Sequence, residues 1–244
     1  MIVDASQFVF KASPEIARAR RVLIKPSAAY PSPYPITTSP EMIMKIIEGI
    51  REVSDADILI LEGTPGGGPI YPIYQALGYN FPRVLMLDVK DCIWVEVDNP
   101  LPKPFAVPTF WIPNVILSSD YLICLSTMKI INDRPEFNIM NLLSTLPTAK
   151  YGNRSTGGWD TLYSLGIDKV IADLYFTLPF DVGIIEARQN FNGKSSQLNQ
   201  GKVEDYGKVI VGEPFDTDNE ASQMLGIKSE YLDLIKMARV GFEA

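Results

Sequence analysis

The sequence predicts an α/β fold with a largely parallel or mixed sheet and helices on both faces. Short all-apolar runs recur, such as Arg21-Val-Leu-Ile-Lys-Pro26 and Asp57-Ile-Leu-Ile-Leu-Glu62, and such runs fit strands that are covered on both faces. These runs alternate with helical patterns, which indicates a sheet with many parallel strands. We expect a single domain over residues 1–244, with candidate subdomain insertions near 98–160 and 187–206.

The first half of the chain reads as strands and helices in turn. Residues 21–25 form the first expected strand, and Ser39-Pro40-Glu41 begins a helix, because proline suits the first helical position and an acid suits the positive end of the helix dipole. The apolar face of this helix comprises Met42, Ile43, Ile46, Ile47, Ile50 and Val53. Further strands are expected at 57–62, 83–88 and 92–97, the last as an edge or antiparallel strand. A short helix is expected around 70–77, before Gly78.

The second half starts with an irregular segment. Five prolines between Asn99 and Pro113 predict a loop or extended arm. A strand at 121–125 and a helix over 137–146 follow, and residues 150–160 read as a mobile loop. We then expect a helix over 160–176, strands at 182–186 and 208–211, and a polar connection over 189–206. Two helices close the chain, one ending at Gly226 and the other beginning at Ser229.

Composition excludes several classes of function. The net charge of −7 argues against nucleic-acid binding. No uninterrupted apolar stretch is long enough for a membrane span, and no signal-peptide pattern starts the chain, so we expect a cytoplasmic protein without membrane partners. The sequence contains no histidine and only two cysteines, Cys92 and Cys124. Ser–His and Cys–His nucleophiles are thereby excluded. We expect no cofactor and no zinc or iron–sulfur site, and any metal that the protein used would be oxygen-ligated, such as Mg²⁺.

Polar groups at the ends of two apolar strands mark the expected site. Ligands in open α/β sheets bind at the carboxyl ends of strands, and Lys25 and Glu62 occupy such ends. Lys25 either extends to solvent or supplies a charge to an anionic ligand. Glu62 either contacts a ligand or Mg²⁺, or is satisfied by neighbouring N–H groups. On adjacent strands the two side chains would instead form an ion pair.

The glycine-rich loop after Glu62 is a candidate ligand-binding segment. Its backbone N–H groups can face an anion, although it lacks the complete pattern of a nucleotide-binding loop, and a flexible turn is the alternative. The residues assigned to ligand binding in this loop are Gly63, Thr64, Gly66, Gly67 and Gly68.

Two further polar positions complete the candidate catalytic set. Lys129 follows the 121–125 strand and precedes Asn132, Asp133 and Arg134, a cluster that reads as either a site wall or a solvated loop. Asp218 lies in Thr217-Asp-Asn-Glu220, which has the form of a capping box, so capping of its own helix is its favoured local role.

These segments together resemble the family known as domain of unknown function number 362. The resemblance is carried by Val22-Leu-Ile-Lys25-Pro26-Ser27, Glu62-Gly63, Met140-Asn141-Leu-Leu-Ser-Thr-Leu-Pro147 and Glu213-Pro214-Phe-Asp-Thr-Asp218. It implies an α/β fold over roughly residues 20–240 and adds Asn141 to the ligand-binding set. The sequence departs from the family pattern at Thr127-Met-Lys129-Ile-Ile131, where the family's histidine is missing, and at Met140, where the family has a lysine.

Three hypotheses about function follow. The first is a protein that binds a small anionic molecule and acts, if it is an enzyme, through Lys25, Glu62, Lys129 and Asp218. The second is a non-catalytic interaction or assembly protein, as a homo-oligomer, with Phe105–Pro113 as its contact surface. The third, an accessory role in iron–sulfur or redox metabolism, rests only on relatives that append a ferredoxin-like module.

Overall fold

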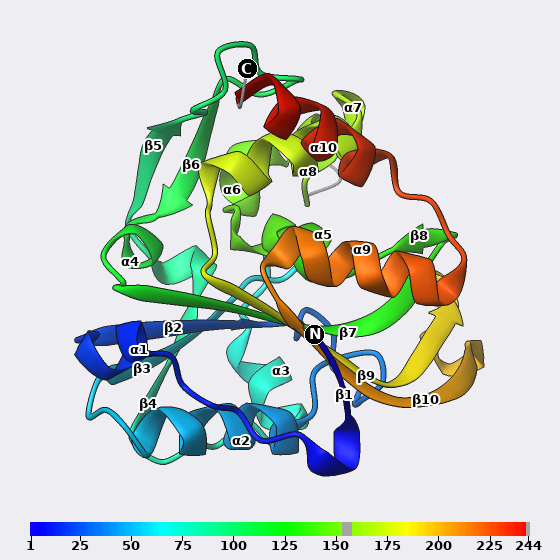
Figure 1. Cartoon of the computed structure of the whole chain (residues 1–244). Helices are drawn as coiled ribbons and strands as arrows, with labels where there is room; N and C mark the ends of the chain where they lie inside the picture. The colour runs from blue at the N-terminus through cyan, green and yellow to red at the C-terminus, as the bar shows by residue number, and fades with distance from the viewer. Residues whose placement is uncertain (153–157, 243–244) are drawn as a thin grey trace.

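A mixed sheet of eight strands forms the centre of the molecule in the computed structural model, which describes residues 1–152 and 158–242 (Figure 1). The order across the sheet is β1 (Ile2–Asp4), β10 (Lys202–Gly212), β9 (Val182–Gly193), β7 (Tyr121–Ile131), β2 (Arg21–Pro26), β3 (Asp57–Glu62) and β4 (Val84–Asp88), and β8 (Arg134–Pro135) pairs with β7. The five strands from β9 to β4 run parallel, whereas β10 is antiparallel to β9 and β1 to β10. The predicted α/β class is confirmed.

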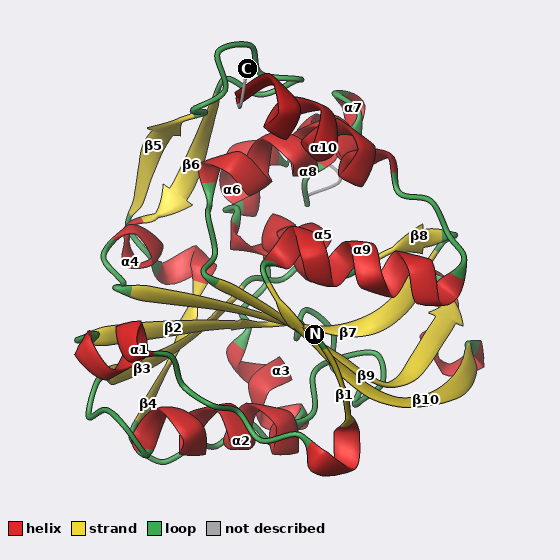
Figure 2. Ribbon diagram, viewed as in Figure 1, coloured by secondary structure: helices red, strands yellow, loops and turns green. Residues whose placement is uncertain are grey.

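Helices cover both faces of the sheet (Figure 2). One face carries α2 (Pro40–Arg51) and α3 (Tyr71–Ala76), and the other carries α5 (Asn138–Asn141), α8 (Ile167–Thr177), α9 (Pro214–Leu225) and α10 (Glu230–Phe242). The hairpin of β5 (Trp94–Asp98) and β6 (Thr109–Pro113) stands beside the second group of helices. The short helices are α1 (Pro14–Arg18), α4 (Asn114–Leu117), α6 (Thr148–Tyr151) and α7 (Asp160–Ser164). No helix among the described residues has the length and apolar character needed to cross a membrane.

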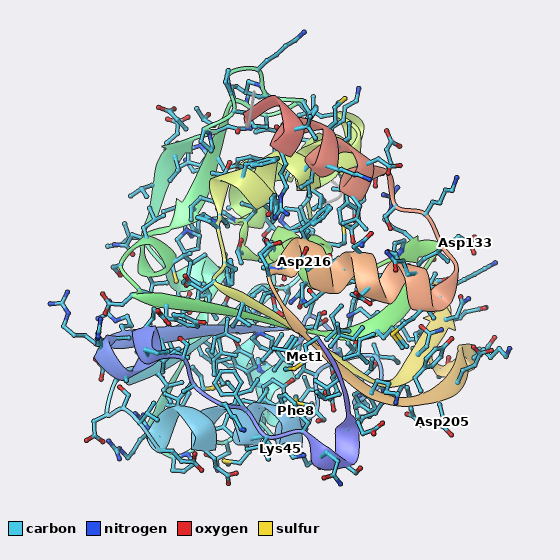
Figure 3. The ribbon with its side chains drawn as sticks, viewed as in Figure 1. Met1, Phe8, Lys45, Asp133, Asp205 and Asp216 are labelled. Carbon is cyan, nitrogen blue, oxygen red and sulfur yellow. The ribbon has the colours of Figure 1, made fainter. Side chains whose placement is uncertain are left out.

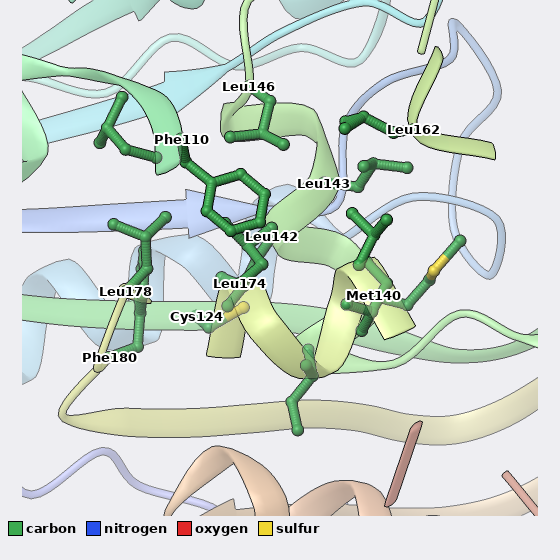
Figure 4. Close-up of a cluster of buried hydrophobic side chains, with 14 of the residues drawn as sticks. Phe110, Cys124, Met140, Leu142, Leu143, Leu146, Leu162, Leu174, Leu178 and Phe180 are labelled. Carbon is green, nitrogen blue, oxygen red and sulfur yellow. The ribbon is translucent and has the colours of Figure 1, made fainter. Parts of the chain in front are cut away.

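Two apolar cores flank the sheet, and β2 contributes to both. Leu23 packs into the core under α5, α8 and α10, part of which is shown in Figure 4. Val22 and Ile24 point the other way, into the core that α2 covers. Burial on both faces is why this strand reads as an uninterrupted apolar run rather than as an alternating one.

The helix α2 begins as the sequence predicts. The Ser39 hydroxyl accepts a hydrogen bond from the Met42 N–H at 3.1 Å, and Pro40 occupies the first turn. The N-terminal segment packs against this helix: the Lys45 ammonium lies 6.0 Å from the centre of the Phe8 ring (Figure 3). A Cβ atom at Gly49 would lie 2.2 Å from the Phe10 carbonyl oxygen, so the close approach of the two segments requires glycine.

Several predicted boundaries were wrong. The proline-rich arm contains the strand β6, in which Phe110 and Ile112 are buried in the core. The strands β9 and β10 extend through most of the expected polar connection over 189–206. The helix expected over 160–176 is divided into α7 and α8 at Gly166, whose φ is 90°. Residues 153–157 of the expected mobile loop lie outside the described residues.

Candidate functional site

The strand order changes direction at the border between β2 and β7. The chain builds β2, β3 and β4 side by side and then returns to place β7 on the other side of β2. The loops that follow β2 and β7 therefore diverge, and such a switch point is where open α/β sheets form their ligand crevice. A pocket of about 290 Å³ lies there. We call it the Lys129 pocket; Ser27, Tyr30, Lys129, Glu136, Asn141 and Tyr163 are among the residues that line it.

Lys25 and Glu62 form a fully buried ion pair beside this pocket. The Lys25 Nζ lies 2.9 Å from Glu62 Oε1 and 3.0 Å from Oε2, and it also donates to the Pro26 carbonyl and to Asn141 Oδ1. The Glu62 carboxylate accepts the N–H groups of Ala28 and Gly63 at 2.8 and 2.9 Å. These partners engage every N–H group of the ammonium. The pair therefore ties the loops after β2 and β3 together, and neither side chain lines the pocket.

Lys129 is held differently, although it is also almost fully buried. Its Nζ donates to the Ser27 hydroxyl at 2.5 Å and to the Ile36 carbonyl at 3.0 Å. The carboxylate that pairs with it is Glu136, at the long distance of 3.8 Å. Burial lowers the pKa of Lys129, and the nearby carboxylates of Glu136 and Glu62 oppose that shift. Lys129 is thus a cation at the pocket wall without a close counter-charge among its described neighbours.

Glu136 is a pocket residue that the sequence reading missed. It faces Lys129 because β7 and β8 form a hairpin around Asn132 and Asp133, which have φ values of 51° and 62°, and the Glu136 N–H donates to the Lys129 carbonyl at 2.9 Å. Burial raises the pKa of the Glu136 carboxyl, and Lys129 partly offsets this. An Asn-Asp pair after an apolar run is compatible with a two-residue hairpin turn, because both residues tolerate a positive φ. Read as a turn, it would have placed Glu136 opposite Lys129.

Tyrosines and an asparagine complete the polar lining. Burial, reinforced by the charge of Glu136, raises the pKa of both Tyr30 and Tyr163, so both phenols stay protonated near neutral pH. Asn141 accepts from Lys25 and turns its amide N–H groups toward the Pro26 carbonyl at 3.3 Å. Arg134, from the polar cluster after Lys129, points elsewhere and pairs with Asp168 at 2.6 Å.

The glycine loop lines a second pocket of about 360 Å³. We call it the glycine-loop pocket; Gly63, Thr64, Gly66, Gly67, Gly68 and Lys90 are among its lining residues. The Thr64 hydroxyl donates to the Gly68 carbonyl at 2.7 Å, and the Gly67 N–H donates to the Thr64 carbonyl at 3.1 Å. Gly158 lines both pockets. The structure thus divides the predicted ligand-binding residues, with Asn141 in one pocket and the glycine loop in the other.

Asp218 lies away from both pockets, in the core between α5, α9 and α10. It accepts the N–H groups of Asn138 and Ile139 at 2.9 Å each, and the Tyr231 hydroxyl at 3.0 Å. Burial raises the pKa of Asp218 to about 7, although these hydrogen bonds act to lower it. The predicted capping box was wrong, because α9 already begins at Pro214 with Glu213 as its cap. Asp218 instead caps a different helix, α5.

The two cysteines are free thiols, Cys124 buried and Cys92 partly exposed. Burial raises the pKa of Cys124 to about 12 and that of Cys92 to about 11. Among the described residues, no group of three or more acidic, cysteine or histidine side chains is arranged to hold a metal ion.

The comparison with protein families gives one finding for this architecture. The family model described as Domain of unknown function (DUF362) matches residues 22–218, which is more than half of the chain. The match includes the buried ion pair, Lys129 and Asp218. No curated protein matches the chain.

Proposed function

Because the chain belongs to the family described as Domain of unknown function (DUF362), a description that states no activity, we propose a function from the chemistry of the site itself. The protein binds a small anionic molecule in the Lys129 pocket, and Lys129 supplies the positive charge. The observation that carries this proposal is a lysine that is 3 % exposed, lines a pocket, and has its paired carboxylate 3.8 Å away.

The contrast between the two buried lysines supports this reading. A charge removed from water is costly unless a counter-charge or several hydrogen bonds compensate it. Lys25 has its carboxylate at 2.9 Å and two further acceptors, so it needs no ligand. Lys129 has two neutral acceptors, and its paired carboxylate lies 3.8 Å away, beyond hydrogen-bond distance. An anion in the pocket would complete its compensation.

The other walls of the pocket suit such a ligand. The Ser27 hydroxyl accepts from Lys129, so its own proton is available to donate to a bound oxygen. The tyrosine hydroxyl groups are further donors at the same pocket. The position at the switch between β2 and β7 is the one where this class of sheet binds ligands.

The test is a panel of phosphate, sulfate, acetate and benzoate at constant ionic strength, measured by calorimetry and by thermal shift. We expect at least one anion to bind the wild-type protein and Lys129→Met to weaken it by tenfold or more, because the variant keeps the length of the side chain and removes the charge. Lys90→Met is the matched control, since Lys90 is an exposed lysine at the glycine-loop pocket. It should leave the affinity unchanged.

Two results would contradict the proposal. If no anion in the panel binds, the proposed anion-binding function is wrong. If the wild-type protein and Lys129→Met bind equally well, the anion does not bind in the Lys129 pocket. A loss caused by Lys90→Met alone would place the anion at the glycine loop instead.

A further inference from the structure

We propose that the ligand of the Lys129 pocket is a carboxylic acid with a flat apolar body, and that Glu136 takes up one proton when this ligand binds. The inference rests on the proposed function and specifies its ligand class. The two chemical parts of the ligand are argued separately, from the polar end of the pocket and from its apolar wall.

The polar end presents an ammonium and a carboxyl group to the same space. Glu136 Oε2 and Lys129 Nζ are 3.8 Å apart, which is too far for a direct hydrogen bond. A single ligand oxygen at about 2.8 Å from each atom fits that separation, since hydrogen bonds of this kind have such lengths. The oxygen would accept from the ammonium. It would also accept from Glu136, but only if the carboxyl group carries a proton.

The hairpin fixes Glu136 in this position. Its backbone is bonded to Lys129 across the two strands, at 2.9 Å from the Glu136 N–H to the Lys129 carbonyl. The side chain is 24 % exposed and open to the pocket, and no described residue donates a hydrogen bond to its carboxyl oxygens. Among its described neighbours Glu136 therefore lacks donors such as the Ala28 and Gly63 N–H groups, which bind the Glu62 carboxylate.

The charges around Glu136 favour protonation once an anion arrives. The ionisable groups around Glu136 are Lys129 from β7 and Arg134 from β8, whose charges act on it, and Tyr30 from the loop after β2 and Asp160 and Tyr163 from α7, which line the same pocket. Arg134 is engaged by Asp168 at 2.6 Å. Lys129 is then the main cation that stabilises an ionised Glu136. A bound carboxylate would neutralise it and add a like charge, and both effects raise the affinity of Glu136 for a proton.

The apolar wall indicates the body of the ligand. Met140 and Trp159 line the pocket, each 6 % exposed, together with Leu143 and the rings of Tyr30 and Tyr163. The Trp159 indole is held in place by its N–H, which donates to the Leu146 carbonyl at 2.9 Å. Aromatic rings and a thioether favour flat, polarisable partners. Benzoate combines such a body with a carboxylate and is the probe of choice.

Calorimetry of benzoate binding near neutral pH, in two cationic buffers of different ionisation enthalpy, measures the protons taken up. We expect up to one proton per benzoate with the wild-type protein, and an affinity that rises by up to about tenfold per unit fall in pH. Glu136→Gln should still bind benzoate, because the amide can donate to the same oxygen, but without proton uptake and without this pH dependence. Asp160→Asn, which changes the other carboxylate of the pocket, should retain the proton uptake, and removal of its negative charge should raise the affinity for benzoate rather than lower it.

The outcomes separate this inference from the proposed function. Binding of benzoate without proton uptake, or unchanged uptake in Glu136→Gln, would overturn the role of Glu136. Loss of the uptake in Asp160→Asn but not in Glu136→Gln would show that Asp160 takes up the proton, and would also overturn the role of Glu136. Binding of phosphate or sulfate without any binding of benzoate would overturn the ligand class and leave the anion-binding function standing.

Discussion

Replacement of Glu62 by glutamine should destabilise the fold by an amount typical of a broken buried ion pair. The carboxylate receives two contacts from the Lys25 ammonium and two backbone N–H groups, and both side chains of the pair are fully buried. Glutamine keeps one accepting oxygen and turns an NH₂ group toward one of those donors. Lys25 also loses its counter-charge. Loss of one partner of a buried pair costs roughly 3–5 kcal/mol.

The assay is urea unfolding followed by tryptophan fluorescence, with Asp55→Asn as the control. Asp55 pairs with Arg83 at 3.1 Å, but its side chain is 93 % exposed, so its removal should cost about 0–1 kcal/mol. The double variant Lys25→Met/Glu62→Gln should lose less than the sum of the two single changes, because neither charge is left alone. If Glu62→Gln lost no more than Asp55→Asn, the reasoning about desolvation would be refuted.

Two further predictions concern other buried positions. Asp218 has a pKa raised to about 7 in the folded state from an ordinary value of 3.8, so the folded protein holds a proton that the unfolded chain has lost, and its contribution to the free energy of unfolding should fall as the pH rises from about 4 to about 7. Asp218→Asn should flatten that slope in urea titrations, whereas Asp216→Asn, an exposed change on the same helix (Figure 3), should leave the slope as it is. Gly49→Ala should lower the free energy of unfolding by roughly 1–3 kcal/mol, since its Cβ would lie 2.2 Å from the Phe10 carbonyl oxygen. Thermal unfolding checks this, with Gly66→Ala as the control because its Cβ would meet nothing within 4 Å. Equal losses of stability in the two variants would show that the N-terminal segment can move away from α2 at little cost.

Much of the parallel part of the sheet could be predicted because its local signals agree with its packing. The run Arg21–Pro26 is apolar because both of its faces are buried. The start of α2 was readable because Ser39 and Pro40 are local signals of a helix N-terminus. Gly226 ends α9 in the left-handed conformation, with φ of 64°, as a glycine at that place indicates.

The wrong predictions concern segments whose structure depends on residues far away in the sequence. The proline-rich arm is fixed by Asp173 of α8, whose carboxylate accepts the N–H groups of Phe105, Ala106 and Val107 at 2.7–2.9 Å. No signal within the arm identifies that partner. Asp218 likewise caps a helix that begins 80 residues earlier in the chain, and a local capping motif in its own segment gave the wrong assignment.

The sequence predicted where in the sheet the polar residues gather better than it predicted the role of each of them. The carboxyl ends of the strands indicated the end of the sheet at which Lys25, Glu62 and Asn141 meet. A buried lysine has a structural role if acceptors within the protein engage its whole ammonium group, and it can bind a ligand if they do not. The loops contribute these acceptors, so the sequence of the strand does not show their number. Glu136 was missed because the Asn132-Asp133 turn was read as part of a polar loop.

The two buried lysines would have different roles in the proposed anion site. The Lys25–Glu62 pair holds the loop after β2 through the Ala28 N–H and the loop after β3 through the Gly63 N–H. Ser27 and Tyr30, which line the Lys129 pocket, lie on the first of these loops. A binding group needs neighbours that are fixed before the ligand arrives. Lys25, whose N–H groups are all engaged, thus positions the walls of the pocket. Lys129, which has fewer acceptors, is the lysine whose charge a bound anion would compensate.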